Sequence, residues 1–332
     1  MSAAEALIIK KRNQAWKNNP YIPGWVTVET VGLDQFFTKP EVAKRCYELF
    51  LSYLQKQAID LADYTFIEPA AGNGAFFDLL QHKKRIGFDL MPLAEGIGKQ
   101  DFLSWYPSRP ATVWEQGDLF YANTIPEDEK YICIGNPPFG YRAWLALAFM
   151  QHASLFSDYI GMILPMAFQS DGKGSPKHRI KTMELVYSEI LPKDSFYTPN
   201  GTKCMINTLF QIWKKGKQID IKKKTCNTWV DIFTVDMRKE RLCGKQKMEK
   251  ADFFLQRTYY DRQPHLVTDF SAVRYVCGYG IIVKQEKERV TKVLDAADWN
   301  EYSNLAAHNC RHISRYHIEK VLTDKGYTDD RL

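Results

Sequence analysis

The segment that most constrains the fold is an apolar run, residues 131–135, which ends at Asn136-Pro137-Pro138-Phe139. Such a run predicts a short buried strand, and two consecutive prolines must end it because proline has no backbone N–H and a fixed φ angle. The strand therefore places one amide side chain and one aromatic ring where it stops. Because ligands of open α/β sheets bind at the carboxyl ends of the strands, we expect a binding site there.

The chemistry of these four residues suits a ligand that carries an exocyclic amino group. The side-chain oxygen of Asn136 and the backbone carbonyl of Pro137 can accept its two hydrogens, while Phe139 stacks on its ring. A proline turn followed by a packed phenylalanine would have the same residues. The four residues alone leave both interpretations open, so the preceding strands have to decide between them.

Residues 64–68 form the first predicted strand, which leads into Pro69-Ala70-Ala71-Gly72-Asn73-Gly74 and a helix predicted over residues 75–81. A strand, a turn of small residues and a helix bring backbone amides against a cofactor. Gly72 and Gly74 permit a ligand to approach the backbone closely. Because the third glycine of the dinucleotide fingerprint is missing, the pattern disfavours an NAD or FAD site.

Carboxylates follow the next predicted strands. The strand at residues 85–89 ends in Asp89, 21 positions after Glu68, which is the separation at which an α/β nucleoside site places an acid for the ribose hydroxyls. A third strand, predicted over residues 111–115, leads to Asp118. One acid at a strand end is common in proteins that bind no ligand, but three in successive β-α units favour a cofactor crevice.

Helices and further strands complete the predicted α/β domain. Apolar residues at helical spacing predict helices over residues 40–58, 142–155 and 177–190, and a fifth strand is predicted over residues 159–165.

A hairpin is predicted at the end of this domain. Asn200-Gly201 lies between apolar runs at residues 195–197 and 204–213, and Asn-Gly in that context is a strong hairpin signal. The sequence therefore predicts a parallel sheet that ends in an antiparallel pair.

In this order, the segments resemble the S-adenosylmethionine-dependent DNA methyltransferases that modify the N6 amino group of adenine, in their gamma subgroup. Phe37-Thr38-Lys39-Pro40 resembles the first cofactor motif of the family, and residues 68–74 resemble its glycine motif. Asp89 and Asp118 stand where the family has its ribose-binding and adenine-binding acids, and Asn136 to Phe139 match its catalytic motif. The resemblance covers about residues 36–215.

This resemblance implies an α/β, Rossmann-like methyltransferase fold with a seven-stranded sheet of order 3-2-1-4-5-7-6, whose strand seven is antiparallel, followed by a smaller α+β domain. The hairpin signal at Asn200-Gly201 fits an antiparallel strand independently.

The resemblance also implies a role for each matching residue. The implied catalytic residues are Asn136, Pro137, Pro138 and Phe139. The implied S-adenosylmethionine-binding residues are Phe37, Thr38, Glu68, Ala70, Gly72, Asn73, Gly74, Asp89, Asp118, Leu119 and Asn136. Asn136 and Pro137 would accept the N6 hydrogens of adenine. Phe139 and Phe196, with Tyr197 as a less favoured substitute for Phe196, would stack on a target base flipped out of the duplex.

Positive charge concentrates in the last third of the 332 residues. Residues 214–332 hold 24 Lys and Arg against 17 Asp and Glu, whereas residues 1–213 hold 21 against 22. We therefore divide the chain into an N-terminal arm (1–35), a catalytic domain (36–216) and a DNA target-recognition domain (217–332) that binds double-stranded DNA. The last domain is small for reading a duplex unaided, which is consistent with a homodimer or a companion subunit.

Basic and aromatic side chains of this last region are candidates for nucleic-acid contact. Those that could follow phosphates are Lys222, Lys223, Lys224, Arg238, Lys239, Arg241, Lys245, Lys247 and Lys250, interleaved with Trp229, Phe233, Phe253 and Phe254. Those that could reach base edges are Arg257, Tyr259, Tyr260, Arg262 and Gln263. For any single one of them a solvated surface role is the alternative.

Composition and cysteine usage suggest a compartment. No apolar run approaches the length of a membrane span, and charges occupy the first 16 residues where a signal peptide would be apolar. Seven scattered cysteines without a Cys-x-x-Cys pair are expected to be reduced. We expect a cytoplasmic protein of bacterial or viral origin without membrane contact.

Two other kinds of chemistry are disfavoured. The chain has no Pro-Cys dipeptide, which the cytosine-C5 methyltransferases need for their nucleophile. His308, Cys310, His312 and His317 match no zinc-binding spacing, so we expect no metal.

Two further functions stay open. An RNA or protein (glutamine) N-methyltransferase uses the same Asn-Pro-Pro-aromatic motif, although such enzymes often carry their recognition region before the catalytic domain. An inactive binding module on the same scaffold would be expected to lose Asn136 or the turn at Gly72, and both are present.

Overall fold

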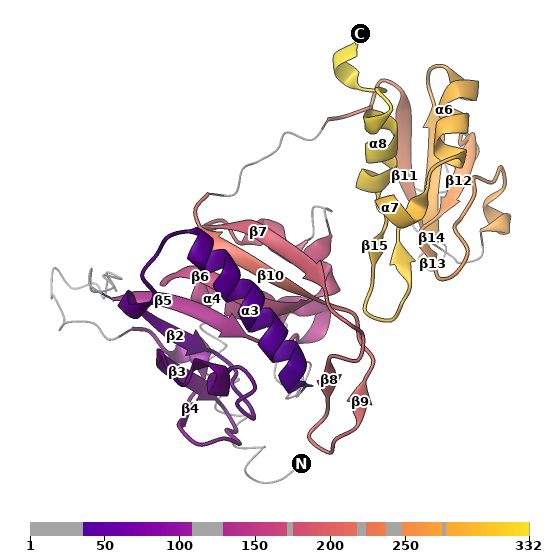
Figure 1. Cartoon of the computed structure of the whole chain (residues 1–332). Coiled ribbons are helices and arrows are strands. Elements are labelled where there is room, and N and C mark those ends of the chain that lie inside the picture. The colour runs from indigo at the N-terminus through magenta and orange to yellow at the C-terminus, as the bar shows by residue number, and fades with distance from the viewer. Residues whose placement is uncertain are drawn as a thin grey trace, which may run out of the picture. The chain divides into compact units, whose positions relative to one another are not determined.

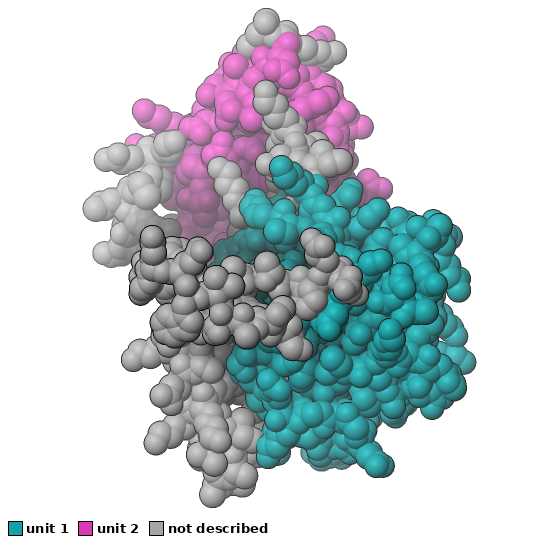
Figure 2. Space-filling model, turned by 90° about the vertical axis from the view of Figure 1, so that its left-hand side faces the viewer, with its two compact units in different colours: residues 1–168, 176–219 teal, residues 169–175, 220–332 magenta. Residues whose placement is uncertain are grey.

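The chain forms two compact units in the computed structural model, which describes residues 36–107, 129–170, 175–217, 224–236, 248–273 and 277–331. Unit 1 contains Met1–Phe168 and Pro176–Ile219, and unit 2 contains Gln169–Ser175 and Asp220–Leu332 (Figure 2). The main division falls between residues 219 and 220, and the boundary that we predicted lies between residues 216 and 217. The predicted arm at residues 1–35 lies outside the described residues.

A seven-stranded sheet is the centre of unit 1, with the order β4-β3-β2-β5-β6-β10-β7 (Figure 1). Its strands are β2 (Tyr64–Glu68), β3 (Lys84–Asp89), β4 (Ile97–Lys99), β5 (Lys130–Gly135), β6 (Ser157–Pro165), β7 (Met183–Ile190) and β10 (Thr208–Lys215). Numbered along the chain within this sheet, the order is 3-2-1-4-5-7-6. β10, the seventh strand, is antiparallel to both neighbours, and the other pairings are parallel. The predicted Rossmann-like methyltransferase fold is confirmed.

Helix α3 (Pro40–Lys56) covers one face of the sheet. Pro40 suits the first helical turn because its fixed φ is already helical and its missing N–H has no partner there. Phe50 of this helix packs against Gly161 of β6, where an added Cβ would lie 2.9 Å from the ring. Glycine at this position therefore lets the helix approach the sheet. The predicted helix over residues 40–58 is confirmed.

Helix α4 (Trp144–Ala153) covers the opposite face (Figure 1). Its Phe149 stacks on Phe102, with ring centroids 5.5 Å apart, and Phe102 belongs to the short 3₁₀ helix η3 (Phe102–Ser104). Tyr131 of β5 joins the same aromatic cluster through Phe156. α4 is thus packed against the loop that follows β4.

Two predicted helices are wrong. Residues 75–81 form only the 3₁₀ helix η2 (Phe77–Leu80), and residues 177–190 form η6 (Pro176–Arg179) followed by strand β7. β7 is an edge strand with one neighbouring strand, so only part of it is buried. Its polar and apolar residues do not alternate regularly along the strand. Its pairing with β10 decides its conformation, since β propensity depends on sheet context.

The hairpin at Asn200-Gly201 is present, but it is not the antiparallel edge of the large sheet. It joins β8 (Phe196–Tyr197) to β9 (Lys203–Cys204), and β8 also pairs with β1 (Phe37–Thr38) in a separate three-stranded sheet. Gly201 takes a left-handed φ of 81°, as the turn requires. The hairpin is therefore an insertion between β7 and β10.

The third strand of the large sheet is β4, which our sequence analysis missed. It has three residues, too few for a periodic pattern. The strand predicted over residues 111–115 lies outside the described residues.

Unit 2 contains a three-stranded antiparallel sheet of order β11-β14-β12 and a smaller one of order β13-β16-β15. Its strands are β11 (Val230–Asp236), β12 (Phe253–Gln256), β13 (Thr258–Tyr259), β14 (Cys277–Val283), β15 (Asn304–Leu305) and β16 (Arg311–His312). Its helices are α6 (Lys287–Asp295), α7 (Trp299–Tyr302) and α8 (Arg315–Asp324). Residues 304–312 form the β15–β16 hairpin, in which Asn304 pairs with His312 and Leu305 with Arg311.

Short 3₁₀ helices complete the described elements: η1 (Leu61–Asp63), η4 (Tyr141–Ala143), η5 (Met166–Gln169), η7 (Phe270–Ala272) and η8 (Asp329–Arg331). Within the described parts of the chain, no helix has the length and apolar character needed to span a membrane.

Candidate cofactor and catalytic site

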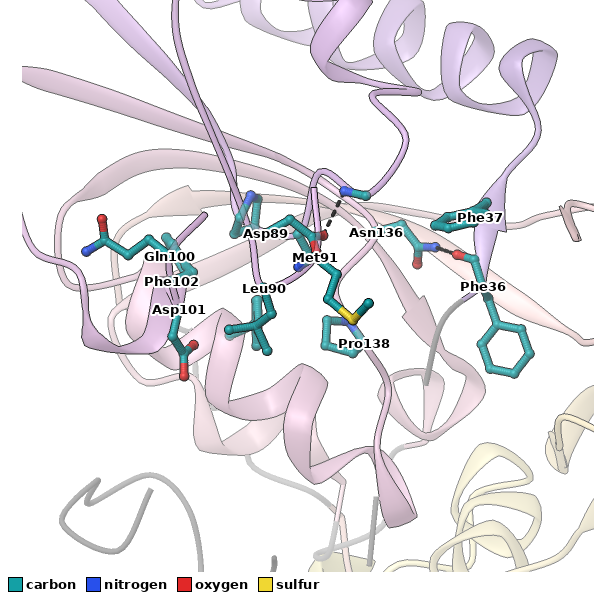
Figure 3. Close-up of a pocket in the computed structure, with 14 residues that line it drawn as sticks. Phe36, Phe37, Asp89, Leu90, Met91, Gln100, Asp101, Phe102, Asn136 and Pro138 are labelled. Atoms are coloured by element: carbon teal, nitrogen blue, oxygen red, sulfur yellow. Dashed lines mark hydrogen bonds between the residues drawn. The ribbon is translucent and has the colours of Figure 1, made fainter. Parts of the chain in front are cut away.

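A cleft lies at the carboxyl ends of β2, β3, β4 and β5, which the sheet order makes neighbours (Figure 3). It has about 650 Å³ of empty space, a figure that includes the open solvent at its mouth. Its lining residues are Phe36, Phe37, Pro69, Ala70, Gly72, Asp89, Leu90, Met91, Gln100, Asp101, Phe102, Asn136, Pro138 and Phe149. The crevice that the strand ends predicted is therefore present.

The turn after β2 requires glycine at Gly72. Its φ is +50°, a conformation that other residues adopt rarely, and an added Cβ would lie 3.1 Å from the Phe37 ring. Phe37 belongs to β1, so the turn packs directly against this strand. The absence of a side chain here keeps the wall of the cleft open.

Asp89 fixes this turn from the end of β3. One carboxylate oxygen accepts a hydrogen bond from the Gly72 backbone N–H at 2.7 Å, and the other accepts from the Met91 N–H, also at 2.7 Å (Figure 3). Each carboxylate oxygen has a further lone pair. Asp89 can thus hold the turn and still accept hydrogen bonds from a ligand in the cleft.

Asn136 is held in one orientation at the end of β5. Its side-chain Nδ2 donates to the Phe36 carbonyl at 3.0 Å, which directs Oδ1 away from Phe36 (Figure 3). Among the described residues Oδ1 is buried and has no hydrogen-bond partner. Because buried polar atoms in proteins are nearly always paired, this oxygen is an acceptor prepared for a donor on a ligand.

The two aromatic residues predicted to stack on a target base contact each other instead. Phe139 is 7% exposed and Phe196 is fully buried, and their rings meet edge to face with centroids 6.3 Å apart. Phe196 therefore offers no open face for stacking in this structure. A base could reach Phe139 only if this contact opened.

Asn73 and Tyr197 form a hydrogen bond that the sequence did not predict. Asn73 Nδ2 donates to the Tyr197 hydroxyl at 2.7 Å, and the Tyr197 ring lies edge-on to Phe37 at 5.8 Å. Asn73, predicted to bind cofactor, is thus used to attach the glycine turn to β8.

Asp101 is an acid in the cleft that our sequence analysis missed. It lies two residues after the end of β4, lines the cleft with Gln100 and Phe102, and accepts from the Leu103 N–H at 3.1 Å. An acid shortly after a short strand was the available signal. Asp118 and Leu119, which were predicted to bind the cofactor, lie outside the described residues.

Glu68 is a buried carboxyl behind the cleft. Burial raises its pKa well above the usual range, nearby Asp89 and Asp78 raise it further, and backbone hydrogen bonds from Phe77 and Phe76 oppose the shift. Its Oε2 has no hydrogen-bond partner among the described residues. Glu68 does not line the cleft, although the sequence assigned it to the cofactor.

The raised pKa of Glu68 makes a testable contribution to stability. Since its pKa is higher in the folded chain than in the unfolded chain, its contribution is fully present below the unfolded pKa and is lost as pH rises through the folded value. We expect the free energy of unfolding of the wild type to fall, relative to that of Glu68→Gln, between acidic and alkaline pH. Urea denaturation of both proteins without cofactor measures this. Parallel pH profiles would show that Glu68 ionises normally.

Not every predicted site residue lies in the cleft. Those that line it are Phe37, Ala70, Gly72, Asp89, Asn136 and Pro138. Those that do not are Thr38, Glu68, Asn73, Gly74, Pro137, Phe139 and Phe196. Thr38 belongs to β1 and is buried on the face opposite to Phe37, because alternate residues of a strand point to opposite faces.

The described residues contain no group of three or more His, Cys, Asp or Glu side chains that could hold a metal ion. In the predicted His/Cys cluster, His312 contacts Thr258 and Cys310, while His317 caps α8 with Ser314. The six described cysteines are free thiols, as expected.

Several candidate nucleic-acid contacts in unit 2 have structural roles. Tyr259 is 2% exposed and its hydroxyl contacts Ser303, and Gln263 holds the start of α7 through Trp299 and Asp298. Trp229 and Phe254 are also buried.

Five of the described candidates are exposed: Lys224, Lys250, Arg257, Tyr260 and Arg262. Tyr260 is 50% exposed, between exposed Arg257 and Arg262. Most of the predicted basic residues, 222–223 and 238–247, lie outside the described residues.

The sheet order, with its single antiparallel strand, and the cleft at the strand ends define the class: this is a Rossmann-like methyltransferase fold. No family model matches the chain, and no curated protein matches it.

Solved structures resemble it distantly. A candidate RNA methyltransferase from Pyrococcus horikoshii is 18% identical, with a TM-score of 0.37 over 55% of this chain and 88% of that one. Magnesium protoporphyrin IX methyltransferase from Synechocystis PCC 6803, with bound SAM, is 13% identical, with a TM-score of 0.34 over 65% and 99% of the two chains. At these TM-scores the likeness carries no argument about function.

Proposed function

We propose that this protein is an S-adenosylmethionine-dependent methyltransferase that modifies the N6 amino group of adenine in DNA, of the gamma subgroup. The observation that carries the proposal is the buried, unpaired Oδ1 of Asn136 at the end of β5, beside a cleft made by four strand ends. An acceptor in that position suits an amino group, and Asn136 is the first residue of the segment 136–139 that resembles the catalytic motif of this family.

The residues of the cleft fit the cofactor. Gly72 leaves space at the turn, Asp89 presents carboxylate oxygens for ribose hydroxyls, and Asp101 is placed to accept from an adenine amino group. Leu90 and Phe102 supply apolar surface for a purine. When bound, S-adenosylmethionine supplies an electrophilic methyl group.

The chain's own residues then have two tasks. Asn136 Oδ1 and the Pro137 carbonyl accept the two N6 hydrogens, which favours a tetrahedral nitrogen and stabilises the positive charge that develops on it. Phe139 stacks on the target base after its contact with Phe196 opens. No strongly basic side chain is needed, because the main requirement is to align the nitrogen with the methyl group.

Double-stranded DNA is the proposed substrate because the excess positive charge follows the catalytic unit and because exposed Tyr260 lies between Arg257 and Arg262. The sequence-specific reading of a duplex, membership of a restriction-modification system, and a homodimer or companion subunit belong to the same proposal. RNA or protein methylation is the second candidate, because the Asn136 geometry suits any exocyclic or side-chain amino group.

Transfer of labelled methyl from S-adenosylmethionine to duplex DNA, total RNA and protein in parallel tests the proposal. Nucleoside analysis should find N6-methyladenine in DNA. Label in RNA or protein alone would reassign the substrate and keep the chemistry, whereas no transfer to any of them would contradict the enzyme proposal.

Asp101 and Asp118 can be distinguished as acceptors for the cofactor's adenine. Asp101→Asn keeps one oxygen for the Leu103 N–H and replaces the other with a donor, so we expect cofactor affinity to fall about 10- to 100-fold, as for a lost bond to a charged acceptor. If Asp118 is the acceptor, as the resemblance implies, Asp118→Asn lowers the affinity instead and Asp101→Asn leaves it within about twofold. Calorimetry with S-adenosylhomocysteine measures both variants, and the one that loses affinity identifies the acceptor.

A further inference from the structure

The three-stranded sheet β1-β8-β9 contacts both halves of the proposed site. β8 is its middle strand, with Tyr197 opposite Phe37 and Phe196 opposite Thr38. Because successive side chains of a strand point to opposite faces, Tyr197 and Phe196 face different surroundings. One strand of two residues therefore contacts two different parts of the molecule.

The Tyr197 face contacts the cofactor turn. The Tyr197 hydroxyl accepts from Asn73 at 2.7 Å, and its ring lies against Phe37, which in turn packs over Gly72. Any shift of β8 at Tyr197 therefore also displaces the turn that shapes the cleft.

The Phe196 face contacts the catalytic motif. Phe196 is fully buried and lies edge to face with Phe139, while the Phe36 carbonyl, next to β1, holds Asn136. A base that stacks on Phe139 has to displace Phe196. Since Phe196 and Tyr197 are consecutive, this displacement moves the residue bonded to Asn73.

Two contacts attach this small sheet to the start of α3. The Lys39 N–H donates to the Ser195 carbonyl at 3.0 Å, and Lys39 Nζ pairs with Asp194 at 2.8 Å. The far end of the hairpin is open to solvent: residues 200–203 are exposed, and Met205 is 64% exposed. A macromolecular substrate can thus reach the hairpin from outside.

We propose that Tyr197 is a positioning residue that couples binding of the target at Asn136–Phe139 to binding of the cofactor at the Gly72–Asn73 turn. This inference rests on the proposed function, since it needs both ligands. The target base displaces Phe196 from Phe139, and the Tyr197–Asn73 hydrogen bond carries this displacement to the turn. Coupling between two ligands is reciprocal, so the cofactor improves target binding by the same factor.

Tyr197→Phe tests the coupling because it removes only the hydroxyl. Calorimetry measures the affinity for S-adenosylhomocysteine with and without a substrate that the wild type methylates. We expect the wild type to bind it about five- to tenfold more tightly with substrate present, within the usual range of coupling. In Tyr197→Phe the factor should fall to about one, with affinity in the absence of substrate changed by less than about threefold, the effect of one neutral hydrogen bond.

Tyr187→Phe is the matched control. Its hydroxyl donates to the Glu189 carboxylate on the edge strand β7, so the substitution also removes one tyrosine hydroxyl with its hydrogen bond, here to a charged acceptor, without touching β8. An unchanged coupling factor in Tyr197→Phe would overturn the inference. If the variant lost affinity for S-adenosylhomocysteine in the absence of substrate but kept the coupling factor, the hydroxyl would have a purely structural role, and the inference would also be overturned. If the wild type methylates a substrate but shows no coupling between the two ligands, the inference is overturned and the proposed function stands. If the wild type methylates no substrate, the proposed function fails and the inference fails with it.

Discussion

Replacing Asn136 with alanine is expected to abolish methyl transfer while cofactor binding persists. The substitution removes the buried Oδ1 that has no partner in the described chain and would accept an N6 hydrogen. It also removes the donor to Phe36. Loss of one preorganised group of this kind costs about 10²- to 10³-fold in kcat, so less than a few per cent of the activity should remain. Single-turnover transfer of labelled methyl measures the loss.

Asn136→Asp provides a sharper comparison. It keeps the shape and the acceptor oxygens but loses the donor to the Phe36 carbonyl and places a carboxylate there. Both variants should be inactive if Asn136 must be fixed and neutral, and both should bind S-adenosylhomocysteine within a few fold of the wild type. Activity above a few per cent in Asn136→Ala would refute the assignment.

Asp89→Asn is expected to weaken cofactor binding by about 100-fold or more. Both carboxylate oxygens accept from backbone N–H groups, of Gly72 and Met91, and asparagine has only one oxygen. Its NH₂ group must therefore face a backbone N–H, which disturbs the turn in addition to losing an acceptor for the ribose. Two lost bonds to a charged acceptor, each about 1.5–3 kcal/mol, give this magnitude.

Asp63→Asn is the control for this prediction. Asp63 is an exposed aspartate that pairs with Lys130 at 3.5 Å at the opposite end of β2, and its loss should leave cofactor affinity unchanged. Calorimetry with S-adenosylhomocysteine, together with thermal unfolding to verify folding, measures both variants. If Asp89→Asn bound the cofactor as well as Asp63→Asn, Asp89 would not belong to the cofactor site.

The sequence by itself determined the place of the cleft, whereas the order of the sheet followed from the resemblance to a known family. The apolar run that ends at Asn136-Pro137 and the turn at Gly72 are local signals, because proline and glycine restrict the backbone wherever they occur. Asp89 followed from its position at a strand end. These features needed no knowledge of neighbouring segments, and the structure places Gly72, Asp89 and Asn136 along one cleft.

Only the tertiary structure decided the remaining features, since each depends on contacts between distant segments. β7 is a strand because β10 pairs with it, and Asp101 enters the cleft because three-residue β4 pairs with β3. Phe196 is buried because it packs on Phe139, 57 residues earlier in the chain, and Tyr197 meets Asn73 across 124 residues. Such pairings leave no periodic signal in the sequence, because the physical partner of each residue is set by the packing of the whole unit.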